Sequence, residues 1–151
     1  MTLKIEEGAS IGANNTFLCG WWSQKEQFKS LNYQRYLHVG AHTRISLNHY
    51  FDVAGAFVLG NKSWIAGRGS QFWTHAAGDQ EHNIHNINIG AGCYIASGVL
   101  FAPGSSVGND CIVGLGSVVT KRINSNNAII AGQPAKVIRE NYDWRTKKDL
   151  C

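Results

Sequence analysis

The sequence has little charge and no long apolar run, and these two absences exclude broad classes of protein. Only 16% of the 151 residues are charged. No segment approaches the roughly 20 consecutive apolar residues that a membrane-spanning helix needs. The first ten residues, MTLKIEEGAS, carry charges where a signal peptide would have its apolar core. We therefore expect a cytoplasmic protein with no membrane span.

The sequence also has no concentrated run of basic residues and no spacing of Cys and His that is typical of a zinc site. The net charge is +4, and the chain carries no recognisable nucleic-acid-binding motif. Half of the 14 basic residues nevertheless fall in the last fifth of the chain: Lys121, Arg122, Lys136, Arg139, Arg145, Lys147 and Lys148. This distribution favours a small polyanionic ligand over a nucleic acid, and we expect no metal.

What the sequence does contain is a repeat of six residues. Apolar residues recur at Ile89, Ile95, Phe101, Val107, Val113 and Val119, and Gly or Ala follows each of the first five. An α-helix repeats its apolar face about every 3.6 residues and a strand every 2, so a period of six fits neither. It is typical of a parallel β-helix, in which three hexapeptides make one coil. The apolar residue then points inward, and the small residue after it occupies a tight corner.

The repeat predicts a single all-β domain over residues 1–151 with three irregular segments. A weak first coil is marked by Ile5, Ile11 and Phe17. An insertion follows at about 18–38, a polar loop at about 76–86, and a C-terminal segment at about 134–151. Loops on a rigid scaffold commonly carry function.

The interior positions between the insertion and the loop are less regular. We place them at Val39, Ile45, Phe51, Phe57 and Ile65, with a two-residue slip near 60–63. The count of six then falls on Gln71, Ala77 and Asn83, which suit the interior poorly. Cys93 and Cys111 are separated by one 18-residue coil. We expect them to stack in adjacent coils as reduced core thiols.

The repeat, followed by SVVTK at 117–121 and AGQPAKVIRE at 131–140, resembles the hexapeptide-repeat acyltransferases. The likeness is greatest to maltose, galactoside and xenobiotic O-acetyltransferases and their polysaccharide-modifying relatives. It implies a left-handed parallel β-helix, acetyl-coenzyme A as the acyl donor, and a homotrimer with each site between neighbouring subunits. Oligomerisation or capping is also expected because open coil ends leave unpaired strand edges.

Transfer of an acetyl group to a hydroxyl needs a base, and histidine suits this role because its reference pKa is near 6.5. The resemblance selects His75 as the catalytic base, since Thr74 and His75 match a short segment of the family that precedes its loop. The family's Pro-Ile-Asp continuation is replaced here by AAGD at 76–79. Asn48, Asp79, His82 and His85 are candidates for binding the acceptor, and His82 or His85 could replace His75 as the base.

The resemblance also assigns a binding region for coenzyme A. Small residues would let the pantetheine arm approach the backbone closely. Basic side chains would neutralise the phosphates of the nucleotide end. The residues that match the family at these places are Ala96, Ser97, Gly116, Ser117, Thr120, Lys121, Lys136 and Arg139.

The sequence therefore predicts an acetyl-coenzyme A-dependent O-acetyltransferase that acts on a sugar hydroxyl of a saccharide or glycan precursor, with direct transfer. Three alternatives remain open at this point. The first is an N-acetyltransferase of an amino sugar, free or nucleotide-linked. The second is a carbonic anhydrase of the γ class, for which no convincing set of three histidines is found. The third is a β-helix that serves as a binding module without catalysis.

Overall fold

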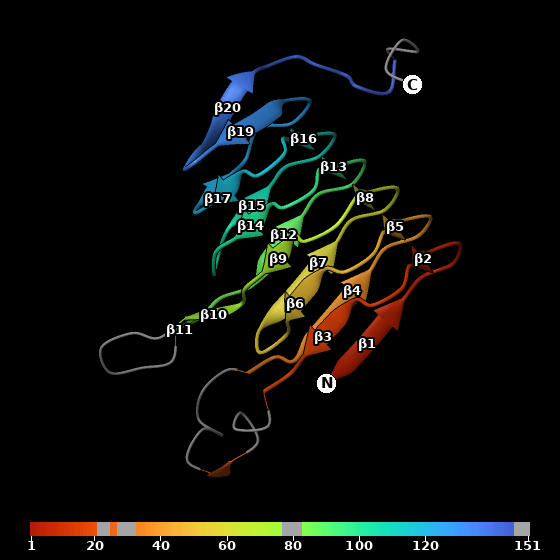
Figure 1. Cartoon of the computed structure of the whole chain (residues 1–151), viewed down its shortest axis with the longest axis vertical. Coiled ribbons are helices and arrows are strands. Elements are labelled where there is room, and N and C mark those ends of the chain that lie inside the picture. Colours follow the sequence, from red (N-terminus) through yellow and green to blue (C-terminus); the bar gives the residue numbers. More distant parts are fainter. Residues whose placement is uncertain (21–24, 27–32, 77–82, 147–151) are drawn as a thin grey trace.

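A computed structural model of the chain describes residues 1–20, 25–26, 33–76 and 83–146, and these form a parallel β-helix with three faces (Figure 1). Strands β1 and β20 lie at opposite ends of this prism (Figure 1). Within the described ranges, no helix is long and apolar enough to cross a membrane. The fold class predicted from the period of six is confirmed.

Each face of the prism is one sheet, to which successive coils contribute one strand each. The first face contains β1 (Thr2–Ile5), β4 (Tyr36–Val39), β7 (Ala56–Leu59), β12 (Ile87–Ile89), β15 (Ser106–Val107) and β18 (Arg122–Ile123). The second contains β2 (Ser10–Ile11), β5 (Arg44–Ile45), β8 (Trp64–Ile65), β13 (Tyr94–Ile95), β16 (Ile112–Val113), β19 (Ile129–Gly132) and β20 (Ala135–Arg139). The third contains β3 (Thr16–Leu18), β6 (Tyr50–Asp52), β9 (Gln71–Phe72), β14 (Leu100–Phe101) and β17 (Val118–Val119).

The register of the strands follows the predicted 18-residue coil. Ile89 pairs with Val107, Ile95 with Val113, and Phe101 with Val119. The first coil is also confirmed, because Ile5, Ile11 and Phe17 pair with Val39, Ile45 and Phe51. Cys93 and Cys111 are free, buried thiols that precede the paired strands β13 and β16, so they occupy equivalent places in adjacent coils.

The corners require small residues for a steric reason that the structure shows directly. A Cβ atom added to Gly90 would lie only 2.5 Å from the carbonyl oxygen of Gly108 in the next coil. Coils follow one another at the spacing of neighbouring strands, about 4.8 Å. No side chain fits between their backbones at this corner.

Two interior positions differ from those predicted by the count of six. Leu59, not Phe57, is the equivalent of Val39, so the two extra residues precede β7 instead of lying near 60–63. Phe72, not Gln71, pairs with the core residue Phe101, because the corner after Ile65 contains one extra residue. Both Gly67 and Gly69 in that corner have positive φ angles, which lets the chain take the longer path.

The structure describes part of each irregular segment. Strand β3 ends at Leu18 and β4 begins at Tyr36, so the insertion occupies 19–35, of which 21–24 and 27–32 lie outside the described residues. The base of the polar loop is an antiparallel ribbon of β10 (His75–Ala76) and β11 (Asn83–Ile84), which projects from the prism (Figure 1). After β20 the chain folds back, and Trp144 Nε1 donates to the Gly92 carbonyl at 3.0 Å.

Four phenylalanines stack along the interior of the third face. Ring centroids are 4.7 Å apart for Phe17 and Phe51, 4.8 Å for Phe51 and Phe72, and 5.2 Å for Phe72 and Phe101. These separations match the rise from one coil to the next. Phe72 is fully buried at the centre of this stack, whereas the neighbouring Gln71 is exposed.

Replacing Phe72 by Ala should destabilise the protein by about 3–5 kcal/mol, because it removes buried contacts and leaves a cavity inside the stack. The matched control, Gln71→Ala, should change stability by about 0.5 kcal/mol or less. Denaturant unfolding of both variants measures the difference. Equal effects of the two substitutions would show that the register of β9 is wrong.

Candidate active site

The candidate base, His75, lies at the edge between the third and first faces, where the chain leaves β9 and enters the β10–β11 ribbon. Its side chain is partly exposed, with 27% of its surface accessible. The ribbon places Ile84 opposite His75, and the amide of His85 donates to the Thr74 carbonyl at 2.8 Å. The ring is thus held where the loop joins the prism.

A buried carboxylate, Asp52, organises the surroundings of His75. Its Oδ2 atom lies 2.7 Å from Nδ1 of His75 and accepts hydrogen bonds from the amides of Thr74 (2.9 Å) and His75 (3.0 Å). The Thr74 hydroxyl is 2.7 Å from the same oxygen and accepts from the Gly55 amide at 2.9 Å. Only 1% of the Asp52 side chain is exposed. One carboxylate oxygen therefore fixes both the backbone and the ring of His75.

The electrostatic consequence is that Asp52 favours the protonated form of the imidazole. Its hydrogen bond raises the pKa of His75 above the usual value, its negative charge adds to the effect, and partial burial opposes it. Because a carboxylate can only accept, the contact also assigns the ring proton to Nδ1 and, in the neutral ring, leaves the lone pair on Nε2.

The aromatic side chains of Trp73 and Tyr50, each two residues before His75 or Asp52 in the chain, pack near this pair. Trp73 lies edge-on to His75, with ring centroids 6.4 Å apart, and packs on Tyr50 at 4.8 Å. Burial raises the pKa of Tyr50, and the charge of Asp52 raises it further. Burial and the charge of Asp52 also raise the pKa of Tyr33, at the end of the insertion, and burial is again the larger cause. The insertion rejoins the prism close to Asp52, where the Arg35 amide donates to the Ala54 carbonyl at 3.1 Å.

The structure brings only part of the predicted acceptor set to this edge. His85 is exposed and packs over Gly104 of the next coil, close to His75. Asp79 and His82 lie outside the described residues. Asn48 is exposed at a different edge, between the second and third faces, where its φ of 57° serves a left-handed corner. Within one chain, Asn48 and His75 are not neighbours.

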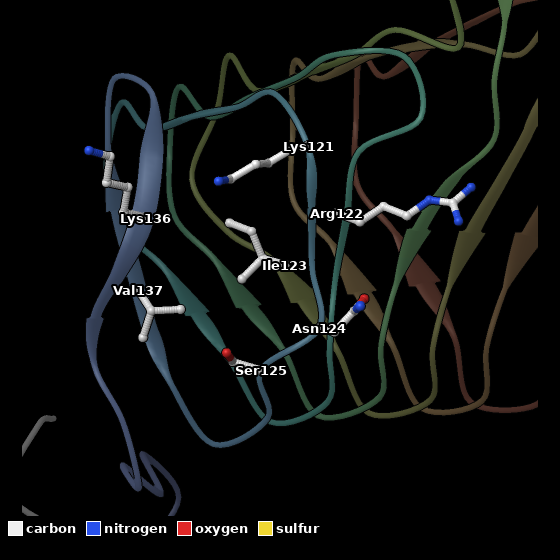
Figure 2. A pocket seen from close by; sticks show the side chains of 7 residues that line it. All are labelled: Lys121, Arg122, Ile123, Asn124, Ser125, Lys136 and Val137. Carbon is white, nitrogen blue, oxygen red and sulfur yellow. The ribbon is translucent and has the colours of Figure 1, made fainter.

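A basic cleft lies further along the same edge as His75. It has a volume of about 240 Å³ and is lined by Lys121, Arg122, Ile123, Asn124, Ser125, Lys136 and Val137. Figure 2 shows the Lys121 side chain extending toward β20, which carries Lys136, while Arg122 points away. Its lining combines the cationic Lys121 and Lys136 with the apolar Ile123 and Val137, which suits an anionic ligand with an apolar portion.

The other predicted cofactor residues are distributed over two edges. Thr120 is exposed and precedes Lys121 at the edge of His75, whereas Ala96, Ser97 and Gly116 lie at the edge between the second and third faces. The Ser117 side chain is buried there and donates to the Gly114 carbonyl at 2.7 Å, so it has a structural contact. Arg139 does not line the cleft; its guanidinium lies 4.8 Å above the ring centre of Tyr142.

Asp52 was absent from the residues selected by sequence, although a signal for it exists. It directly follows the interior residue Phe51, at a position where the hexapeptides from Ile89 to Gly114 have Gly or Ala. A carboxylate directly after an interior residue therefore departs from the pattern of the regular hexapeptides. Such breaks are expected at functional sites.

Comparison with known proteins gives both sequence relatives and structural neighbours. The chain is 44% identical over 57 residues to galactoside O-acetyltransferase of Escherichia coli (strain K12), covering 38% of this chain and 28% of that protein. It is 36% identical over 86 residues to a putative colanic acid biosynthesis acetyltransferase of the same organism, covering 57% and 45%. No family model matches the chain. The matches thus span less than half the length of these relatives.

A solved structure extends the likeness over most of the fold. A hexapeptide-repeat acetyltransferase of Vibrio cholerae, complexed with acetyl coenzyme A, superposes with a TM-score of 0.67 at 22% identity, covering 91% of this chain and 73% of that one. The coils share the left-handed β-helix of such proteins, as the resemblance implied. The relatives and neighbours are hexapeptide-repeat acetyltransferases, the family that the sequence resembles.

Proposed function

Because the relatives of this chain by sequence and by fold are hexapeptide-repeat acetyltransferases, we propose that it transfers an acetyl group from acetyl-coenzyme A to a hydroxyl of a saccharide. The observation that carries the proposal is the arrangement of one edge of the prism. The edge holds a histidine bound to a buried carboxylate and, two coils further on, a basic cleft. These are the two groups that such a transfer needs.

His75 acts as the general base in this proposal. Its Nε2 takes the proton of the acceptor hydroxyl while the hydroxyl oxygen attacks the thioester carbonyl. Collapse of the tetrahedral intermediate breaks the carbon–sulfur bond, and the departing thiolate takes the proton from the imidazolium. The products are an ester and the free thiol of coenzyme A, with no covalent enzyme intermediate.

The basic cleft receives the phosphates of coenzyme A. Lys121 and Lys136 supply positive charge from two strands that are far apart in sequence. His75 follows β9 and Lys121 follows β17, so they lie at one edge about two coils, or roughly 10 Å, apart along the axis. An extended pantetheine arm lying along this edge connects the two.

The third face supports a homotrimer. Its strands contain one charged residue, Asp52, which is buried. Exposed large apolar side chains gather on this face and its borders: Leu18, Leu47, Trp73, Leu100 and Leu115. An uncharged apolar face of this kind is typical of a surface that another subunit covers.

The distribution of the predicted cofactor residues supports the same assembly. His75, Thr120 and Lys121 lie on one side of the third face, and Ala96, Ser97 and Gly116 on the other. One molecule of coenzyme A reaches both groups if the edge of one subunit faces the opposite edge of its neighbour. A heterologous contact that closes after three copies provides this arrangement.

Replacing Lys121 and Lys136 together by Ala should weaken coenzyme A binding. An exposed ion pair contributes about 0–1 kcal/mol, so each lysine should account for several-fold in the dissociation constant. The loss should shrink for a coenzyme that lacks the 3′-phosphate. Calorimetric titration measures both, and Arg139→Ala, which removes a cation outside the cleft, is the control. Unchanged affinity in the double variant would place the nucleotide elsewhere.

Replacing Leu100 by Glu should dissociate the trimer, because it buries a charge in the contact between third faces. Sedimentation should show a monomer with a retained β-sheet spectrum and strongly reduced activity. Leu3→Glu changes an exposed leucine on the first face, 52% accessible against 36% for Leu100, and should leave the trimer intact. A wild-type protein that sediments as a monomer would contradict the shared site.

Replacing His75 by Ala should lower kcat by roughly 10²–10⁴, the usual contribution of a general base, with acetyl-coenzyme A binding nearly unchanged. The wild-type rate should rise with pH through a titration above the usual histidine value, because Asp52 raises the pKa of His75. His38→Ala removes a histidine bound to Glu6 on the first face and should retain activity. Near-normal turnover of the His75 variant would move the base to another residue.

A further inference from the structure

We propose that Asp52 is the positioning residue of the site: it selects the tautomer of His75, holds its ring, and sets the pH at which His75 becomes a base. This proposal rests on the proposed function for its catalytic meaning. Its structural content, the control of His75 by Asp52, can be tested independently of catalysis.

The contacts of Asp52 exceed what the fold requires at this corner. At the same corner the other coils have Leu18, Trp73, Ala102 and Thr120, none of them acidic, so the corner forms without a carboxylate. Asp52 instead directs its carboxylate toward the next coil, where Oδ2 meets the amides of Thr74 and His75 and the His75 ring. A buried carboxylate costs free energy unless it is hydrogen-bonded, and the segment that carries the base supplies the hydrogen bonds to Oδ2.

The same contacts fix the geometry of the base in two ways. The two amide bonds set the backbone from Thr74 to His75, and therefore the point from which the ring projects. The Nδ1 contact then limits rotation of the ring and places the lone pair on Nε2. A base held in one orientation loses less entropy when the acceptor binds.

The charges and titratable groups that face the pair come from several elements. Asp52 on β6 faces Tyr50 of its own strand and Tyr33 of the insertion. His75 faces Trp73, and His85 follows the paired strand β11. Among these described neighbours Asp52 is the group with a negative charge at neutral pH. Removing that charge should therefore lower the pKa of His75.

The decisive variant is Asp52→Asn, which keeps the shape of the side chain and removes the charge. Titration of the His75 ring by NMR should move to lower pH in the resting protein, without substrate. The pH limb of the rate should move in the same direction. We expect kcat to fall by at most the roughly 10²–10⁴ that the base contributes, with the KM for acetyl-coenzyme A unchanged. A purely structural role would reduce the amount of folded enzyme without moving either titration.

The chain provides a matched control in its second histidine–carboxylate pair. His38 Nε2 lies 2.8 Å from Glu6 Oε1 on the first face. Glu6→Gln removes a carboxylate from a histidine in the same way, and it should leave the His75 titration and the rate profile unchanged. An equal shift of the His75 titration in both variants would overturn the proposal, because it would indicate a general effect of net charge.

A measurement on the unaltered protein covers the case in which Asp52→Asn fails to fold. Nitrogen-15 NMR of the neutral His75 ring should show the proton on Nδ1; the Nε2 tautomer would overturn the proposal. An unchanged His75 titration in folded Asp52→Asn would also overturn it. If the titration shifts but the wild-type protein acetylates no acceptor, the proposed function fails and the role of Asp52 toward His75 stands.

Discussion

The rest of the structure depends on the constraint that each coil must stack its interior side chains on those of the coil before. The coils advance by one strand spacing, about 4.8 Å, so nothing larger than a flat ring or a branched aliphatic group fits inside. The phenylalanine stack of the third face meets this limit, with centroid separations of 4.7–5.2 Å. Because the interior is filled by stacking alone, the polar chemistry of the protein is confined to the edges and the outer faces.

Three of the irregularities of the repeat lie at one edge. The two extra residues before β7, the end of the insertion at Tyr33 and the base of the loop at His75 all lie where the third face meets the first. Gly55, in the corner before β7, is packed against Ile84 and Asn86 of the loop base and against Thr74. The longer corner after Asp52 also coincides with a buried carboxylate, since Asp52 is the acidic side chain that is buried among the residues the structure describes.

The sequence was sufficient to predict the fold, since a six-residue period has few physical interpretations. It failed at Phe72 and Leu59 because extra residues in a corner shift the count without leaving a mark in hydrophobicity. His75 was found through a resemblance to a family, whereas Asp52 was missed because the two are 23 residues apart and meet only when adjacent coils stack. The separation of Arg139 from the basic cleft also depends on tertiary packing, here on Tyr142.

The most direct test of the central claim is a thiol-release assay with acetyl-coenzyme A and a panel of saccharides and matched amino sugars, followed by mass and NMR analysis of the product. The account predicts that coenzyme A is released only when a saccharide with a free hydroxyl is present, and that the product is an alkali-labile O-acetyl ester. Transfer to amino groups alone, or no release dependent on an acceptor, would contradict it.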